Sequence, residues 1–149
     1  MKIFKILIIL LAVILTVKSS KSQTSASCKN FAKSGFEILD TNVFVHDGRY
    51  NALKLSEGDK IDVYKPFYKG RTYKIVVVSE DNLPVLSFKV INIQRQTLYE
   101  SGESNNAQYW EYTPEKNENL IITVEIPAAD ASEKVENGCV AVIVGYKTS

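Results

Sequence analysis

Val85-Leu86-Ser87-Phe88-Lys89-Val90-Ile91-Asn92-Ile93 (residues 85–93) alternates apolar and polar side chains through its centre. Successive side chains of a β-strand point to opposite faces, so Leu86, Phe88 and Val90 share one face, and Ser87 and Lys89 share the other. Alternation with a period of two is typical of a strand with one buried face. This stretch therefore predicts a sheet that covers an apolar core.

The segments on either side extend the same pattern. Further strands are predicted at residues 50–55, 60–67, 72–79, 96–100, 107–113, 119–126 and 140–146. Turn signals such as Glu57-Gly58-Asp59 and Lys69-Gly70-Arg71 separate them. Short strands at this spacing are typical of an antiparallel sandwich or barrel. We expect an all-β fold, a jelly-roll-like antiparallel β-sandwich of about eight strands.

Three segments refine this prediction. Residues 28–40 permit either a short helical turn or a strand, and residues 127–137 permit a loop or a short helix. Val140–Tyr146 is apolar on both faces, so we expect this last strand to lie centrally in a sheet. Pro66 indicates the end of its strand or an edge position, because proline has no N–H to donate to a ladder.

The N-terminal segment predicts export. Lys2 and Lys5 precede the apolar run Ile6–Val17, which would rise about 18 Å as a helix, short of the roughly 30 Å hydrocarbon core. We therefore expect a signal peptide at residues 1–22, with cleavage after Ala26 as the second choice, rather than a membrane anchor. Lipidation of Cys28 is disfavoured by the serine at position 25. Residues 23–149 would form one domain, secreted or periplasmic, with no membrane contact in the mature form.

The charge balance changes when the leader is removed. The chain carries 18 Lys and Arg against 17 Asp and Glu, and four of those lysines lie in the leader, which leaves a net charge of −3. A mildly acidic domain has no general attraction to nucleic acid or to anionic lipid. We expect no nucleic-acid partner.

Cys28 and Cys139 are the two cysteines of the chain. In an oxidising compartment an isolated pair most simply forms one disulfide. The alternative is two free, buried thiols. The disulfide would tie the start of the mature chain to the last predicted strand.

No set of residues predicts catalysis, and we expect neither a cofactor nor a metal. His46 is the single histidine, and with both cysteines oxidised too few ligands remain for zinc. There is no G-x-S-x-G motif, no C-x-x-C pair and no glycine-rich phosphate loop. His46-Asp47-Gly48-Arg49 is most simply a polar turn. A small hydrolase that uses His46 is kept as an alternative.

Aromatic side chains are the remaining candidates for binding. In a strand, Trp110 and Tyr112 share one face, which favours the core, and Tyr109 points the other way. The alternative is an exposed aromatic surface for sugar rings or a protein partner. The candidate binding residues are Tyr68, Tyr99, Tyr109 and Trp110.

Residues 70–147 carry a family resemblance. Gly70-Arg71-Thr72-Tyr73-Lys74-Ile75 resembles the opening G-x-x-Y-x-I strand of bacterial pre-peptidase C-terminal β-sandwich domains. The segments that follow in a similar order are 88–90, 98–99, 110–114, 120–124 and 141–146. The resemblance implies an accessory module rather than a catalyst. Leu83-Pro84-Val85-Leu86 stands where those domains carry an acidic segment, which argues against a calcium site.

Taken together, the sequence predicts an exported, non-catalytic binding or interaction module with a protein or glycan partner. A carbohydrate-binding module and a His46 hydrolase are the two alternatives.

Overall fold

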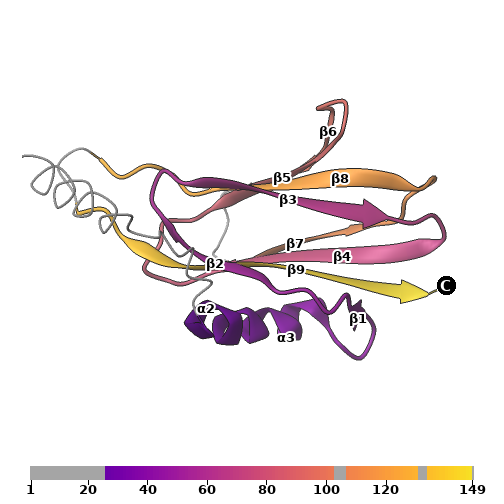
Figure 1. The fold of residues 1–149 in the computed structure, drawn as a ribbon, viewed down its shortest axis with the longest axis horizontal. Coiled ribbons are helices and arrows are strands. Elements are labelled where there is room, and N and C mark those ends of the chain that lie inside the picture. The colour runs from indigo at the N-terminus through magenta and orange to yellow at the C-terminus, as the bar shows by residue number, and fades with distance from the viewer. Residues whose placement is uncertain (1–25, 103–106, 131–133, 149) are drawn as a thin grey trace, which may run out of the picture.

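The computed structural model describes residues 26–102, 107–130 and 134–148, and the predicted leader at 1–22 lies outside these residues. Two antiparallel sheets lie face to face, and a short helical segment lies beneath one of them (Figure 1). Within the described ranges, no helix has the length and apolar character needed to cross a membrane.

The lower sheet in Figure 1, sheet A, is built around a long C-terminal strand. Its strands are β1 (Val45–His46), β2 (Asn51–Ser56), β4 (Arg71–Ser79), β7 (Ala107–Tyr112) and β9 (Asn137–Thr148). β4 and β7 follow β9 on one side, and β1 and β2 both pair with β9 on the other. The prediction that residues 140–146 lie centrally in a sheet is confirmed.

The upper sheet, sheet B, has the order β3-β8-β5-β6. Its strands are β3 (Lys60–Phe67), β5 (Ser87–Asn92), β6 (Thr97–Glu100) and β8 (Glu118–Glu125). β3 is an edge strand, and Pro66 lies near its end, as the sequence indicated.

The strand pairs are nested in sequence. β5 pairs with β6, β4 with β7, β3 with β8 and β2 with β9, all antiparallel. The chain is therefore one long double-stranded hairpin rolled into two sheets, which is the jelly-roll arrangement. The predicted all-β jelly-roll-like sandwich is confirmed, and the two-residue strand β1 is an addition to its eight strands.

The inner faces of both sheets form the main core. Alternate residues point inward along each strand, as in Ile75 and Val77 of β4 and Ile122 and Val124 of β8, which are all fully buried. At about 25 cal/mol per Å² of apolar surface, each such side chain contributes roughly 1.5–3 kcal/mol on burial. Period-two patterning thus produces the two-sheet interior that the sequence predicted.

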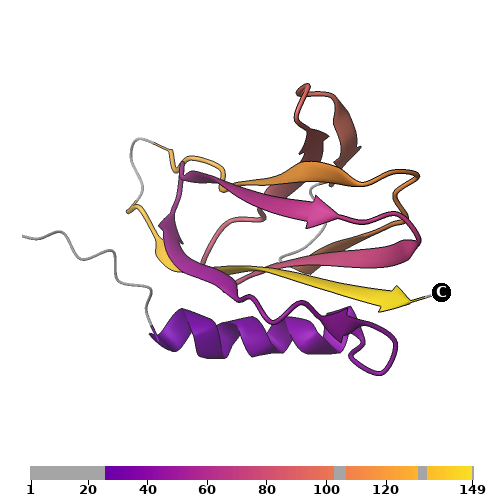
Figure 2. The same cartoon turned by 45° about the vertical axis from the view of Figure 1, so that its right-hand side comes forward.

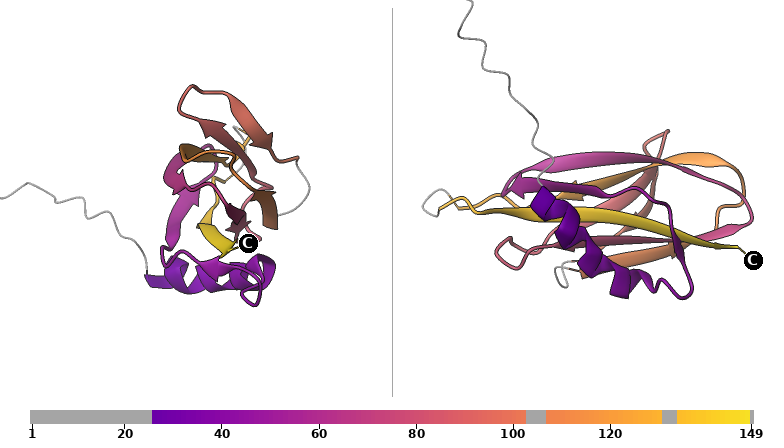
Figure 3. Two further views of the ribbon diagram at one scale, coloured as in Figure 1. Left: turned by 90° about the vertical axis from the view of Figure 1, so that its right-hand side faces the viewer. Right: turned by 60° about the horizontal axis from the view of Figure 1, so that its bottom comes forward.

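A helical layer over sheet A is the main difference from the sequence prediction. Residues 28–40, which were ambiguous, lie in α2 (Ala26–Phe31), η1 (Ala32–Ser34) and α3 (Gly35–Leu39), apart from Asp40. The three pieces follow one another along the outer face of sheet A (Figures 2 and 3). They cover outward-facing apolar residues of β4 and β9, among them Val76 and Ile143. This second core explains why β9 is apolar on both faces.

The disulfide fastens this layer to the sheet. Cys28 of α2 and Cys139 of β9 are bonded, with a Cα–Cα distance of 5.1 Å and a sequence separation of 111 residues. The predicted pairing is confirmed. In the chain-entropy model a loop of this length stabilises the folded state by roughly 4.7 kcal/mol.

We predict that Gly145→Ala loosens the helical layer. A Cβ at Gly145 of β9 would lie 2.7 Å from Leu39 Cδ1 and 3.2 Å from Leu39 Cγ, so the buried Leu39 side chain of α3 must move. Overpacking of this kind costs about 1–3 kcal/mol in the free energy of unfolding, which urea denaturation measures.

Gly102→Ala is the matched control, because a Cβ at Gly102 meets nothing within 4 Å. In a Leu39→Ala background the same Gly145→Ala change is expected to cost little. An equal loss in both backgrounds would show that Leu39 is not the obstacle.

Candidate functional site

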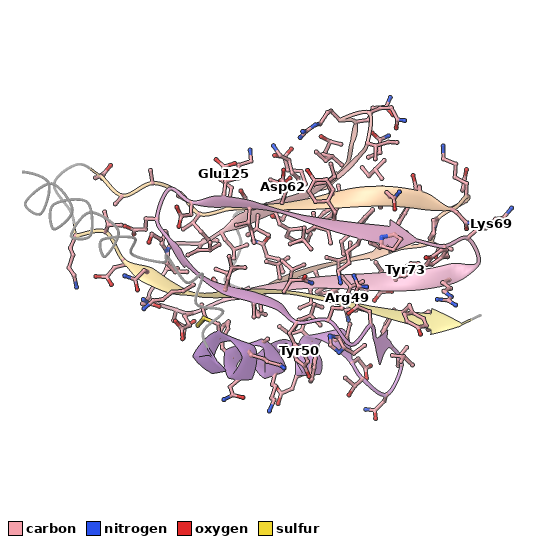
Figure 4. All side chains as sticks on the ribbon, viewed as in Figure 1. Arg49, Tyr50, Asp62, Lys69, Tyr73 and Glu125 are labelled. Atoms are coloured by element: carbon pink, nitrogen blue, oxygen red, sulfur yellow. A yellow bond between two sulfur atoms is a disulfide. The ribbon has the colours of Figure 1, made fainter. Side chains whose placement is uncertain are left out.

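A pocket of about 160 Å³ opens at the end of the sandwich where β3 ends and β4 begins. Arg49, Lys69 and Tyr73 are labelled toward this end in Figure 4. Its walls come from the β1–β2 turn, the end of β3, the β3–β4 turn, the start of β4 and the C-terminal half of β9. The lining residues are Asp47, Arg49, Lys65, Pro66, Tyr68, Arg71, Tyr73, Val144 and Tyr146. Three of them carry a positive charge and one carries a negative charge.

A partly buried ion pair lines this pocket. Lys65 pairs in register with Leu120, and it therefore points inward, on the same face of β3 as Val63 and Phe67. Its side chain is only 5% exposed, and its Nζ donates to Asp47 Oδ2 at 2.5 Å. An ammonium group in such a position is costly unless a partner compensates its charge. Asp47 provides that compensation.

The turn at residues 46–49 holds Asp47 in place. Gly48 has φ of +80°, which a residue without Cβ adopts without strain. The Asp47 N–H donates to the Val144 carbonyl at 3.0 Å, and Asp47 Oδ1 accepts the Arg49 N–H at 2.9 Å. The carboxylate is thus fixed between the turn and β9. The polar turn that the sequence indicated is confirmed and has a defined partner.

Two guanidinium groups are left without a negative partner. Arg49 and Arg71 both line the pocket, and neither forms an ion pair within the described part of the chain. The Arg71 guanidinium lies 4.7 Å from the centroid of the Tyr146 ring and 5.7 Å from that of Tyr68. Cation–π contacts orient the guanidinium plane and leave its N–H edge for an acceptor. The lining therefore carries more positive than negative charge.

The four aromatic residues singled out from the sequence lie in three places. Tyr68 stands at the rim of the pocket, half exposed, and its N–H donates to Tyr73 Oη at 2.9 Å. Tyr109 points outward from sheet A, with the Lys74 ammonium 4.4 Å from its ring centroid. Tyr99 and Trp110 stack on each other at 5.1 Å on the inner side. The structure does not bring these four residues into one surface.

Stacked aromatic rings lie on the inner side of the sandwich, on β6 of sheet B and β7 of sheet A. Trp110 stacks on Tyr99 and on Tyr112, the latter with centroids 4.8 Å apart. Tyr112 Oη donates to Glu118 Oε1 at 2.6 Å. Burial, followed by this hydrogen bond and the charges of Glu118 and Glu115, raises the pKa of Tyr112 to about 12. Trp110 and Tyr112 thus belong to the core side of the sheet, with the phenol hydroxyl at its rim.

His46 precedes Asp47, which lines the pocket, and packs against two aromatic rings. Its Nδ1 accepts the Gly48 N–H at 3.3 Å, and its ring packs 5.0 Å from both Phe36 and Tyr50. Its Nε2 is buried, lies 3.7 Å from Asp47 Oδ1, and has no hydrogen-bond partner among the residues described. Within the same residues, no group of three His, Cys, Asp or Glu side chains could hold a metal ion.

Of the residues that line this pocket, only Tyr68, and not Lys65, Arg49 or Arg71, was expected from the sequence as a binding candidate. A signal for Lys65 was present, since it stands in the row Ile61, Val63, Lys65, Phe67 of otherwise apolar residues. A lysine in the apolar row of a strand predicts a buried charge with a partner.

Comparison with known proteins gives no family. No family model matches the chain, and no curated protein matches it. Among solved structures, the fold is similar to the crystal structure of Aeromonas hydrophila PliG, a periplasmic lysozyme inhibitor of g-type lysozyme, with 17% sequence identity and a TM-score of 0.47. The match covers 68% of this chain and 89% of that chain. The resemblance of residues 70–147 to pre-peptidase C-terminal domains stays a prediction.

We predict that Asp47→Asn destabilises the fold more than Lys65→Met does. The neutral amide would leave a buried ammonium without a charge partner, which costs about 3 kcal/mol in the free energy of unfolding. Lys65→Met replaces the charge by apolar volume and leaves Asp47, which is 20% exposed, in contact with water. Chemical denaturation of the two single variants and of the double variant measures the coupling.

The double variant Asp47→Asn/Lys65→Met is expected to regain most of the loss, because no unpaired charge remains. Additive losses would contradict a stabilising ion pair.

We predict that Tyr112 makes stability fall at alkaline pH. Its pKa is about 12 in the fold, against an ordinary value of 10.0. Its contribution is therefore complete below about pH 10 and is lost as the pH rises toward 12, because the unfolded chain releases the proton first. Urea denaturation at about pH 9 and about pH 11 should show wild type losing more stability than Tyr112→Phe over this interval.

Tyr64→Phe, at an exposed position of β3, controls for removal of a phenol. A pH dependence equal in wild type and Tyr112→Phe would contradict the raised pKa.

Proposed function

We propose that this chain is an exported, non-catalytic binding module, and that its binding site is the pocket between the β1–β2 and β3–β4 turns. The observation that carries the proposal is the presence of two guanidinium groups without carboxylate partners among the described residues, beside the rings of Tyr68, Tyr73 and Tyr146. Arginine and tyrosine are the residues that dominate binding surfaces. The partner is a protein or a glycan that presents negative charge.

The surroundings of His46 support binding rather than catalysis. A general base must reach the proton that it removes, through a ring nitrogen that is free to accept. Nδ1 of His46 accepts the Gly48 N–H, and Nε2 is buried beside the Asp47 carboxylate. Lys65, the other basic group of the pocket, is engaged by Asp47. These groups shape the pocket and hold its charge.

Export is supported by two features of different kinds. Residues 1–22 have the pattern of a signal peptide, and the chain holds a disulfide between Cys28 and Cys139. Disulfides persist in oxidising compartments such as the periplasm and the extracellular space. The proposed location is therefore secreted or periplasmic.

This geometry gives less support to the carbohydrate-binding alternative than to the pocket proposed above. A platform for sugar rings needs exposed aromatic faces that lie side by side. Tyr68 and Tyr109 are both exposed, but the first follows β3 at the pocket and the second points outward from β7. A glycan would therefore have to use the pocket itself, with Tyr68 as the ring that it stacks on.

The test compares two charge-matched variants. Arg49→Gln/Arg71→Gln removes both unpaired guanidinium groups, and Lys33→Gln/Lys54→Gln removes two exposed lysines that do not line the pocket. Purified exported protein is applied at one salt concentration to an array of neutral glycans, acidic glycans, and acidic and neutral peptides. We expect wild type to bind acidic ligands, with about a tenfold loss in the arginine variant and little change in the lysine variant.

Two results would overturn the proposal. One is equal binding, or equal failure to bind, by wild type and the arginine variant. The other is turnover of cell-envelope polysaccharide or ester substrates that Tyr68→Ala retains and His46→Ala abolishes, because it would place chemistry at the imidazole.

A further inference from the structure

We infer that the pocket receives a single carboxylate group, carried by an aspartate or glutamate side chain of a protein partner. The inference rests on the proposed function and specifies what the binding site recognises. It follows from the size of the pocket, from the donors that line it and from the nature of its walls.

The volume of the pocket limits the size of the ligand group that can enter it. Sites that enclose a whole small ligand have volumes of about 300–1,000 Å³. This pocket has about 160 Å³. It is therefore smaller than the sites that enclose a whole small ligand, and only part of a ligand enters it. The remainder of the ligand stays outside, which means that the group projects from a larger molecule.

The donors at the pocket are arranged for an anion. The Lys65 ammonium has three hydrogens, and its bond to Asp47 is its one hydrogen bond within the described residues. Arg71, held against Tyr146 and Tyr68, presents the edge of a planar fork that matches the two oxygens of a carboxylate. Arg49 adds a second guanidinium. With Asp47 counted, the lining carries a net charge of +2.

The apolar walls distinguish a carboxylate on a methylene arm from a bare anion. Tyr73, Val144 and Tyr146 line the pocket beside the charged groups. Tyr73 and Val144 are almost fully buried, so low-dielectric protein lies behind this wall and strengthens charge interactions near it. Methylene groups of a glutamate or aspartate side chain can pack on this wall, whereas inorganic phosphate has none. An acidic sugar carries its carboxylate directly on the ring, and the ring would have to enter the pocket.

The experiment is a titration followed by ¹H–¹⁵N NMR at constant ionic strength. The probes are N-acetyl-glutamate N-methylamide, its neutral glutamine counterpart, glucuronate and inorganic phosphate. The reporters are the backbone amides of Gly48, Arg49, Tyr68 and Arg71. We expect saturable shifts with the glutamate probe, with a Kd in roughly the millimolar range for so small a ligand, and about tenfold weaker binding of the glutamine probe.

Variants distinguish recognition of the carboxylate by Arg71 from a general effect of positive charge on the protein. Arg71→Gln is expected to weaken the glutamate probe at least about fivefold, and Arg71→Lys, which keeps the charge but loses the fork, to weaken it less. Lys33→Gln, outside the pocket lining, is the control and is expected to leave the Kd unchanged. Unchanged binding in Arg71→Gln would overturn the inference.

The remaining outcomes of the titration also test the carboxylate inference. Tighter binding of phosphate than of the glutamate probe overturns carboxylate recognition, and tighter binding of glucuronate overturns the protein source in favour of an acidic glycan. If no probe shifts the four amides while the arginine variant still loses array binding, the carboxylate inference fails and the proposed function stands. If neither experiment shows a role for the pocket, both fail.

Discussion

Burial of sheet A on both faces is the constraint on which this structure depends. Its inner face packs on sheet B, and its outer face packs on the helical layer, so the paired central parts of β4 and β9 must be apolar on both faces. The disulfide between Cys28 and Cys139 then fastens the outer layer to the most central strand. With this anchoring, one end of the sandwich can tolerate polar groups that would otherwise weaken a small domain.

The pocket shows how those polar groups are accommodated. An inward-facing lysine would normally destabilise a sandwich, but the turn at residues 46–49 brings Asp47 to it and is itself bonded to β9. β9, the strand at the centre of sheet A, therefore also positions the Asp47 carboxylate beside Lys65. Arg49 and Arg71 also line the pocket, where contact with water compensates their charge.

The sequence predicted the strands and turns, which depend on residues that are close together in the chain. Alternation in residues 85–93 and 119–126, and turn signals such as Glu57-Gly58-Asp59, predicted strands that the structure contains. The sequence did not decide between helix and strand for residues 28–40. The helical segment there is broken into three short pieces, and Ala32, Ser34 and Gly35 give no clear amphipathic period. The site was harder still, since Asp47 and Lys65 meet only through strand register and a turn.

Pro66 has a consequence for how anything could approach this end of the molecule. It lies on the open edge of sheet B and also lines the pocket, and it has no N–H to offer. An incoming extended segment therefore meets no backbone donor at Pro66, which disfavours the addition of a fifth strand at this end of β3. In the proposed function, recognition at this rim therefore relies on side chains and not on backbone hydrogen bonds.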